Sequence, residues 1–109
     1  KIKGVCLHST AGAIGAAVPE EILEYRLKKL KDLGCNAIRF SHNPASPEML
    51  DICDTLGFMV MTEAFDEWEI KKKWGPDYGY HVHFDKWHKS DLTNMIRRDF
   101  NHPSVIMYS

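Results

Sequence analysis

Polar side chains gather directly after three apolar segments of this sequence. They carry histidine, arginine, asparagine and carboxylate groups and occupy His8–Thr10, Arg39–Pro44 and Glu63–Trp68. Carboxylates that share a cleft can bind sugar hydroxyls, hold a divalent cation or transfer protons. Arginine and histidine add positively polarised hydrogen-bond donors. If the fold brings the three clusters together, the sequence predicts a polar binding or catalytic site.

Arg39 lies inside an otherwise apolar segment, Cys35–Ser41. A guanidinium in such surroundings is costly unless a carboxylate or a ligand oxygen meets it. Glu63 is the obvious partner. Two compatible interpretations remain open, a structural ion pair or an arginine that holds an active-site carboxylate. His42, just beyond the same segment, either donates a hydrogen bond to a substrate hydroxyl or only packs its loop.

Three carboxylates, Glu63, Asp66 and Glu67, crowd the end of the third apolar segment. They are either ligand-binding groups or solvated loop charges. Trp68 and Trp74 follow them, and both suit the stacking of an apolar ring on the face of a sugar. The alternative is a packed flap that only covers the site.

Three further histidines have weaker chemical signals. His81 and His83 would share one side of an extended segment, but a metal site needs further ligands, so this pair alone does not predict one. His102 lies in Asn101–Pro103, just before an apolar segment, on the side of an α/β sheet that serves stability. We therefore expect His102 to belong to a structural turn.

Composition excludes several classes of partner. Of 109 residues, 44% are hydrophobic and 27% are charged, and the formal net charge is −1, as is typical of a soluble globular domain. A nearly neutral chain lacks the electrostatic footprint of nucleic-acid or membrane-surface binding, so neither partner is expected. No apolar run approaches the ~20 residues that span a bilayer, and no signal peptide is evident. The chain starts at Lys1 without an initiator Met, so we expect that its natural start has been removed, and the compartment is unknown.

The three cysteines do not indicate a metal or a disulfide framework. Cys6, Cys35 and Cys53 are odd in number and share no C-x-x-C spacing. We expect buried thiols that behave as small hydrophobic side chains.

Apolar segments and helical patterns alternate along the chain, which predicts an α/β fold with a parallel sheet and right-handed crossovers. Strands are predicted at Ile2–Leu7, Cys35–Ser41, Phe58–Met61 and Ser104–Tyr108, and helices at Pro19–Leu33, from Ser46 to Gly57 and at about Asp85–Asp99. Ligands of such folds bind beyond the carboxyl ends of the strands, where the three polar clusters belong. Either a doubly wound open sheet or part of a (β/α)8 barrel fits the pattern. The loop His8–Val18 lacks the G-x-G-x-x-G motif of dinucleotide-binding sheets.

Local signals fix helix ends and faces. Ser46 is a typical N-cap of the second helix, and Gly57 is a typical C-terminal stop. In the last helix, the spacing of Leu92, Met95 and Ile96 predicts that these three side chains form its buried face.

Two segments resemble the signatures of glycoside hydrolase family 2. The first signature is matched by Asn36–Pro44, continued by Met49, Leu50, Asp54, Gly57 and Phe58–Met61, and the start of the second by Asp99–Ser109. Glu63–Trp68 is similar to the end of the third barrel strand in β-galactosidase-type members. Gly12–Ala17 is similar to their glycine- and alanine-rich first loop. The resemblance spans essentially the whole sequence.

The resemblance implies that residues 1–109 are the N-terminal half of a (β/α)8 TIM barrel, with about four parallel strands and three helices, in a catalytic domain. The implied activity is retaining hydrolysis of terminal β-galactosides, which needs two carboxyl groups about 5–5.5 Å apart. The resemblance places the acid/base directly after Ser109 and the nucleophile at the end of the seventh strand. This chain therefore holds no catalytic residue, and in isolation it is expected to be inactive.

The same resemblance implies the partners of the chain. They are a β-galactoside substrate, the remaining half of the barrel and the flanking β-sandwich domains of the parent enzyme. No cofactor is required, although a divalent cation is possible in the parent enzyme.

Position by position, the resemblance implies a sugar pocket lined by His8, Arg39 and His42. Asn43 occupies a place where many members have an aromatic residue. The candidate substrate-binding residues are, in chain order, His8, Arg39, His42, Asn43, Glu63, Asp66, Glu67 and Trp68.

Some positions depart from the family pattern. Asp66 and Glu67 would lie at the pocket edge, where some β-galactosidases recruit a cation, but Glu69 stands where a ligand histidine is expected. The metal is therefore left unassigned. Ser9-Thr10 stand where close relatives often have His-Asp, and Thr62 replaces a frequent Asp. These substitutions leave the expected fold unchanged and the exact sugar open.

Two alternatives remain. A β-glucuronidase or β-mannosidase would keep the family and change the sugar, although Phe65–Trp68 favours a galactosidase. A non-catalytic carbohydrate-binding barrel would keep the scaffold without the reaction. The residues that follow Ser109 in the coding sequence distinguish this second alternative from an enzyme.

Overall fold

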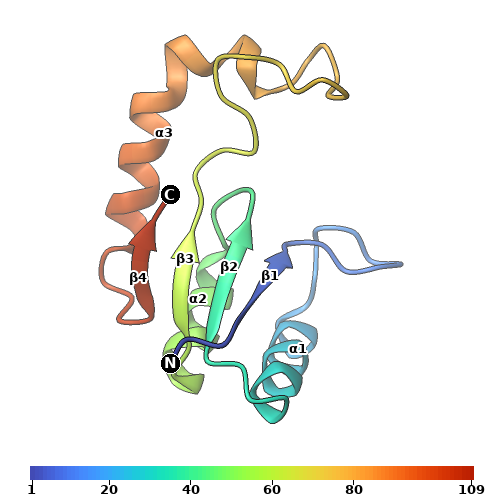
Figure 1. Cartoon of the computed structure of the whole chain (residues 1–109), viewed down its shortest axis with the longest axis vertical. Helices are drawn as coiled ribbons and strands as arrows, with labels where there is room; N and C mark the ends of the chain where they lie inside the picture. The colour runs from blue at the N-terminus through green and yellow to red at the C-terminus, as the bar shows by residue number, and fades with distance from the viewer.

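Four parallel β-strands and three α-helices alternate along the chain in the computed structural model, which describes residues 1–109 (Figure 1). The elements are β1 (Gly4–His8), α1 (Glu20–Asp32), β2 (Ala37–Ser41), α2 (Pro47–Leu56), β3 (Met59–Thr62), the short 3-10 helix η1 (Tyr80–Val82), α3 (Phe84–Asp99) and β4 (Val105–Tyr108). The strands form one sheet in chain order. The predicted α/β alternation, with four parallel strands and three helices, is confirmed. No helix is both long and apolar enough to cross a membrane.

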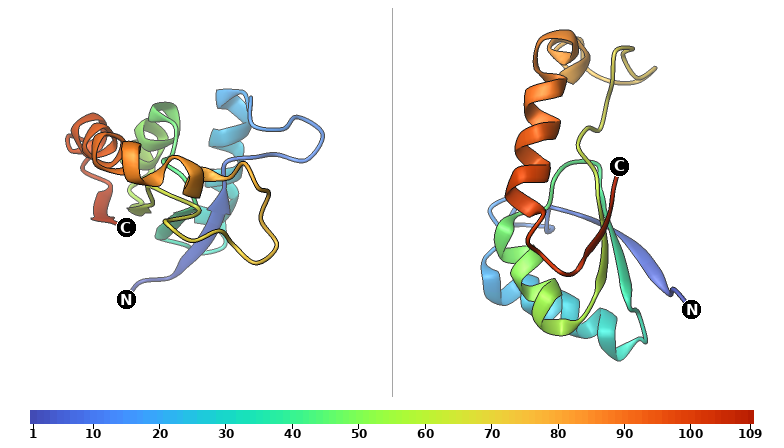
Figure 2. Two further views of the ribbon diagram at one scale, coloured as in Figure 1. Left: turned by 90° about the horizontal axis from the view of Figure 1, so that it is seen from above. Right: turned by 90° about the vertical axis from the view of Figure 1, so that its left-hand side faces the viewer.

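The helices lie on one side of the sheet and leave its other face without a helix (Figure 2). The parallel register pairs Leu7 with Phe40 across β1 and β2, and Arg39 with Met61 across β2 and β3. Because side chains alternate along a strand, the buried Phe40 faces the helices, whereas Arg39 belongs to the opposite surface, the helix-free face. A cavity of about 330 Å³ on that face is lined mainly by apolar side chains, among them Met61 and Met107.

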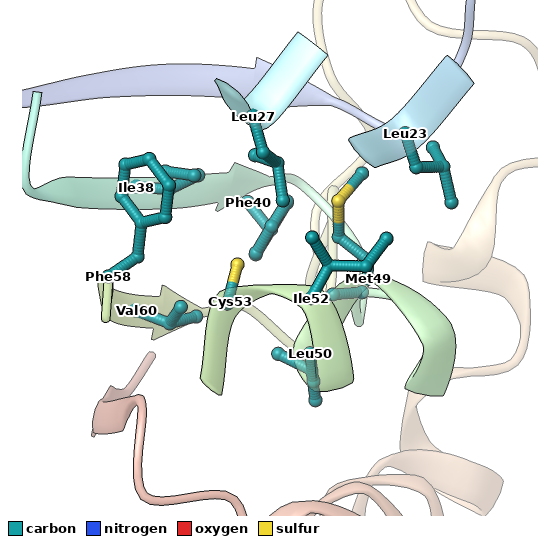
Figure 3. Packing of buried hydrophobic residues seen from close by; sticks show 11 residues of the cluster. Leu23, Leu27, Ile38, Phe40, Met49, Leu50, Ile52, Cys53, Phe58 and Val60 are labelled. Carbon is teal, nitrogen blue, oxygen red and sulfur yellow. The ribbon is translucent and has the colours of Figure 1, made fainter. Parts of the chain in front are cut away.

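The hydrophobic core lies between the sheet and the helices α1 and α2 (Figure 3). Leu23 and Leu27 of α1 meet Met49 and Cys53 of α2 over Phe40 of β2. Full burial of a large apolar side chain contributes about 1.5–3 kcal/mol. The apolar faces of both helices therefore hold them on the sheet.

Helix α2 begins and ends at the predicted signals. Ser46 Oγ accepts a hydrogen bond from the Met49 amide at 3.3 Å, which satisfies one free donor of the first turn. Gly57 ends the helix in the left-handed conformation, with φ of 67°, where a side chain would be strained.

The first and third strands run beyond their apolar segments. β1 includes His8, which pairs with Ser41 of β2, and β3 includes Thr62, which pairs with Tyr108 of β4. Backbone pairing continues where the hydrophobic pattern stops, because it does not depend on side-chain polarity. The strand ends predicted from apolar residues alone are therefore one residue short.

Two predictions of burial are wrong. Met95 of α3 is buried, but Leu92 and Ile96 are 36% and 38% exposed. Helix α3 stands beside β4 and rises past the carboxyl ends of the strands (Figure 1), so little of this chain covers its side. Cys6 is also exposed, because it lies on the helix-free face, while Cys53 is buried as predicted.

Asp54 fastens the turn before β4 to helix α2 at the amino-terminal end of the sheet. Its carboxylate lies 2.7 Å from His102 Nδ1 and accepts a hydrogen bond from the Ser104 amide at 2.9 Å. Burial alone would raise the pKa of Asp54, but hydrogen bonds from Ser104 and His102 outweigh it and hold this pKa below its ordinary value. The structural role predicted for His102 is confirmed.

Replacement of the Asp54 carboxylate is expected to destabilise the domain. Asp54 lies at the end of the sheet away from the candidate site, so no direct effect on ligand binding is expected. Asp54→Ala removes two hydrogen bonds to a charged group and should lower the free energy of unfolding by about 2–4 kcal/mol. Asp51→Ala is the matched control, since Asp51 is exposed and lies 3.8 Å from His102 Nδ1. Thermal melting of the complete protein that contains this chain measures both. Equal melting temperatures for the two variants would contradict the assignment.

Candidate sugar-binding site

A polar pocket opens at the carboxyl ends of β1 and β2, with a volume of about 250 Å³. Its lining has no hydrophobic residue and consists of His8, Ser9, Thr10, Ser41, His42, Asn43 and Asp66. Two larger cavities, of about 320 and 330 Å³, have mainly apolar linings. The position and the chemistry of the polar pocket single it out, because ligands of parallel α/β sheets bind at this end of the strands.

Glu63 joins the ends of β2 and β3. It follows β3 and is 6% exposed. Its Oε1 accepts a hydrogen bond from Arg39 Nε, and its Oε2 lies 2.9 Å from His42 Nδ1. Burial opposes ionisation of Glu63, but the hydrogen bonds from Arg39 and His42 prevail and the pKa of Glu63 lies below its ordinary value. The predicted ion pair is confirmed, and it leaves an ionised Glu63 beside a cationic Arg39.

Arg39 reaches the polar pocket indirectly. Its side chain lies on the helix-free face, beside Cys6 and Met61, and does not line the polar pocket itself. The side chain is 49% exposed, and only its Nε is used for Glu63. The terminal amino groups of the guanidinium are therefore directed to no protein acceptor. The imidazole of His42 links this network to the pocket, where it also meets the ring of His8 edge-on at 5.6 Å.

Glu67 closes the loop that follows β3. Its carboxylate accepts hydrogen bonds from the amides of Lys72, at 2.8 Å, and His81, at 3.2 Å, and lies 2.7 Å from His81 Nδ1. The Lys72 amide and the His81 ring lower the pKa of Glu67 to about 2. We call this contact the Glu67 clasp. Since Glu67 is 7% exposed, it lies inside its own loop and not at the pocket edge, contrary to the prediction.

The clasp is stable over a pH range that follows from this shift. A free glutamate has a pKa of about 4.3, and the folded value is lower. The stabilisation is therefore complete well above pH 4.3 and is lost as the pH falls through the folded pKa. At neutral pH the Glu67 clasp stays closed.

An aromatic cluster fixes the base of the same loop on the start of α3. Phe65 stacks on Tyr80 at 4.8 Å between ring centres and meets the buried Phe84 edge-on at 5.7 Å. Trp68 stacks on Phe84 at 5.9 Å. Tyr80 also donates a hydrogen bond from its hydroxyl to Asp91 at 2.6 Å. Burial and this carboxylate raise the pKa of Tyr80 to about 12.

The carboxylates Asp66 and Glu67 do not converge on a common point. Asp66 lines the polar pocket and pairs with Lys72 Nζ, whereas both oxygens of Glu67 are used inside the loop. His81 belongs to η1 and contacts Glu67, and His83 does not share this contact. The one group of three possible metal ligands consists of Asp51, Asp54 and His102, at the opposite end of the sheet.

Sequence reasoning missed the partnership of Glu67 with His81. The two residues are separated by an aperiodic segment, so no spacing rule connects them. The glycines of this segment were the available signal. A Cβ on Gly79 would lie 2.1 Å from Glu67 Oε2, and one on Gly75 would lie 3.2 Å from Oε1. Only glycine lets the backbone approach the buried carboxylate so closely.

The chain matches known proteins over its whole length. The family model for the TIM barrel domain of glycosyl hydrolases family 2 matches residues 1–109. The chain belongs to glycoside hydrolase family 2. It is 54% identical over 109 residues to β-galactosidase BoGH2A of Bacteroides ovatus, and this match covers 100% of the chain and 12% of the relative.

Solved structures of family 2 enzymes show the same fold. A β-glycosidase from Bacteroides vulgatus matches with a TM-score of 0.93 and 56% identity, over 99% of this chain and 14% of that protein. β-Glucuronidase 3 from Bacteroides uniformis matches with a TM-score of 0.81 and 31% identity, over 98% of this chain and 13% of that protein. The family 2 barrel segment therefore spans about one-eighth of the proteins it matches.

The close approach of Gly79 to Glu67 lets us predict the effect of the substitution Gly79→Ala. The backbone of Gly79, with φ of −70° and ψ of 177°, suits alanine, so the obstacle is the clasp itself: the added Cβ would lie 2.1 Å from Glu67 Oε2 and 3.0 Å from His81 Nδ1. Gly79→Ala should open the clasp and speed hydrogen exchange of the segment 67–81 roughly tenfold, as expected for lost hydrogen bonds to a charged group.

The measurement is peptide-resolved hydrogen exchange on the complete protein at neutral pH. Gly12→Ala is the matched control, because a Cβ there meets nothing within 4 Å. Unchanged exchange of the segment 67–81 in Gly79→Ala would show that the clasp does not hold the loop.

Proposed function

We propose that this chain forms the floor and one wall of the sugar pocket in a retaining β-galactosidase. The observation that carries the proposal is the network of Arg39, Glu63 and His42 beside a pocket without hydrophobic lining. Hydroxyl, amide, imidazole and carboxylate groups in one pocket suit a ligand rich in hydroxyls. The 54% identity to a β-galactosidase supports galactose as the sugar.

Each part of the network has a distinct role in this proposal. Arg39 uses Nε for Glu63, and its terminal amino groups donate to oxygens of the bound sugar. His42 is oriented by Glu63 through Nδ1, so its Nε2 is left for the substrate. Asn43 and Asp66 line the pocket and supply further hydrogen-bonding groups for sugar hydroxyls. Donors fixed before the substrate arrives stabilise the transition state without reorganisation.

The carboxylates of this chain are unsuited to the two catalytic roles. Retaining hydrolysis needs a general acid whose pKa is raised, and a nucleophile about 5–5.5 Å away from it. The pKa values of Glu63 and Glu67 are both lowered, and both carboxylates are engaged by protein donors. This supports an acid/base and a nucleophile from the remainder of the parent enzyme.

The helix-free face also supports the view that this chain is completed by further parts of the parent enzyme. Arg39, Met61 and Met107 line a mainly apolar cavity there, and Ile106 of β4 is exposed. In a closed (β/α)8 barrel this face is the packed interior. We therefore propose that the remaining strands of the barrel cover it, with the flanking domains of the parent enzyme beyond them.

A β-glucuronidase is the second candidate, favoured by the likeness to β-glucuronidase 3 of B. uniformis. A uronate needs a cation that is free to pair with its carboxylate. Lys72 near the polar pocket already pairs with Asp66, and Arg26 donates to the carbonyls of His8 and Thr10. The charge of Arg39 is offset by Glu63, although its terminal amino groups can still donate to neutral hydroxyls. A neutral sugar therefore suits this part of the site better.

Hydrolysis of a panel of nitrophenyl β-glycosides by the complete protein tests the proposal. The panel contains the galactoside, glucuronide and mannoside. We expect the galactoside to have the highest kcat/KM. The highest value for the glucuronide would replace the proposed sugar, and no hydrolysis of any glycoside would favour a non-catalytic barrel.

Arg39→Ala is expected to lower kcat/KM for the nitrophenyl β-galactoside on the order of 10²-fold, since it removes a fixed donor and leaves Glu63 without its cation. Arg97→Ala on the surface of α3 is the control and should retain the activity. Circular dichroism of both variants checks the fold. Equal activity of the Arg39→Ala and Arg97→Ala variants would show that the network of Arg39, Glu63 and His42 does not contribute to hydrolysis.

A further inference from the structure

We propose that Arg98, near the end of α3, is a positioning residue for the sugar pocket. It holds the loop of residues 42–45 between β2 and α2, which carries His42 and Asn43 into that pocket. The inference rests on the proposed function and adds to it a residue that does not itself line the pocket. Its starting point is the hydrogen bond that Arg98 Nη2 donates to the Ala45 carbonyl at 2.6 Å.

The backbone of this loop has little support of its own. Residues 42–45 make no hydrogen bond to another backbone group, and Pro44 has no amide hydrogen to donate. Ala45 is buried, and a buried carbonyl without a donor is costly. Arg98 supplies that donor. Its bond to Ala45 is the one hydrogen bond that the backbone of these four residues makes.

Asp99 fixes the direction of the Arg98 guanidinium. The carboxylate of Asp99 is fully buried and accepts hydrogen bonds from Arg98 Nε and, at 2.9 Å, from Nη2. A buried carboxylate at the last residue of a helix is doubly unfavourable, because burial disfavours the charge and the helix dipole is negative there. The two-pronged pairing with Arg98 offsets this cost and orients the guanidinium. Since Nη2 carries two hydrogens, it serves Asp99 and Ala45 at once.

Packing between the loop and α3 is incomplete. In the right-hand view of Figure 2, the end of α3 stands beside the start of α2, to which the loop leads. A cavity of about 220 Å³ nevertheless lies between Pro44 of the loop and Met95 and Arg98 of α3. The bond from Arg98 to Ala45 therefore joins two elements that side-chain packing does not hold together at this point.

The position of His42 depends on this support. Its Nδ1 is held by Glu63, but its backbone belongs to the loop that Arg98 holds. A loop that moves would shift the imidazole and the neighbouring Asn43 relative to a bound sugar. Small shifts of positioned groups have large effects on rate, so Arg98 is expected to influence hydrolysis without touching the substrate.

The test measures kcat/KM of the complete protein for the nitrophenyl glycoside that the wild type hydrolyses best, below the melting temperature of every variant. A displacement of about 1 Å can cost about 10²-fold in rate, so Arg98→Ala should lower kcat/KM at least about tenfold. Arg98→Lys keeps a cation with several donors beside Asp99 and should regain most of the activity.

The controls separate positioning from stability. Arg98→Ala leaves the charge of Asp99 buried and uncompensated, which destabilises the fold. Asp54→Ala also destabilises the domain, but at the other end of the sheet, so it should lower the melting temperature and keep kcat/KM. The double variant Arg98→Met/Asp99→Asn leaves no charge unpaired, and it should fold and still lose kcat/KM. Arg97→Ala, on the exposed surface of α3, should change neither quantity.

A double-mutant cycle with His42→Ala identifies the route of the effect. If Arg98 acts through the loop, the combined loss in His42→Ala/Arg98→Ala is smaller than the product of the two single losses. The reason is that Arg98 then supports a side chain that is already absent. A combined loss equal to the product would overturn the inference, because Arg98 would act independently of His42.

Two further results would overturn the inference while leaving the proposed function intact. The first is a wild-type kcat/KM in Arg98→Ala, and the second is an equal fall of kcat/KM in Asp54→Ala, which would make lost stability the cause. Failure of the proposed function is distinguishable, because the wild type would then hydrolyse no member of the glycoside panel, and that result would remove this inference as well.

Discussion

The buried carboxylate of Glu63 is the constraint on which the arrangement of the site depends. It needs donors, and both of them, Arg39 and His42, come from the neighbouring strand and its extension. The register makes this possible. Arg39 pairs with Met61, and Glu63 lies two residues beyond Met61, on the same face of the sheet. A slip of one residue would turn Arg39 towards the helices and leave the buried carboxylate of Glu63 without its cation.

Glu67 is a buried, hydrogen-bonded glutamate like Glu63, but it affects a different part of the structure. Both are buried glutamates with a lowered pKa, and they lie four residues apart. Glu63 is held by side chains of a neighbouring strand, one of which also lines the polar pocket. Glu67 is held by two amides and a histidine of its own loop. The first therefore fixes groups that can reach a ligand, and the second fixes the shape of a loop.

Periodicity and local signals predicted most of the fold, because helix faces and caps depend on nearby residues. Ser46 and Gly57 are examples of such local control. The pairing of Arg39 with Glu63 was also predictable, since a charge in an apolar strand requires a partner. These features need no knowledge of distant packing.

The errors have a common physical origin in contacts that spacing does not encode. Leu92 and Ile96 follow a buried helical pattern, yet their exposure depends on which neighbours stand beside α3. The contact of Glu67 with His81 depends on the path of an aperiodic loop. The glycines of that loop are its only local sequence signal.

The charges of the site separate binding from proton transfer. Arg39 offsets Glu63 and Lys72 offsets Asp66, so the charged groups around the polar pocket lie in pairs. Paired charges with fixed geometry are suited to orient a neutral ligand. They offer hydrogen-bond donors and acceptors, while their opposite charges balance each other. A general acid requires the reverse environment, in which ionisation of a carboxyl is disfavoured. A sheet end built to hold Glu63 ionised is for that reason suited to position the sugar and unsuited to protonate it.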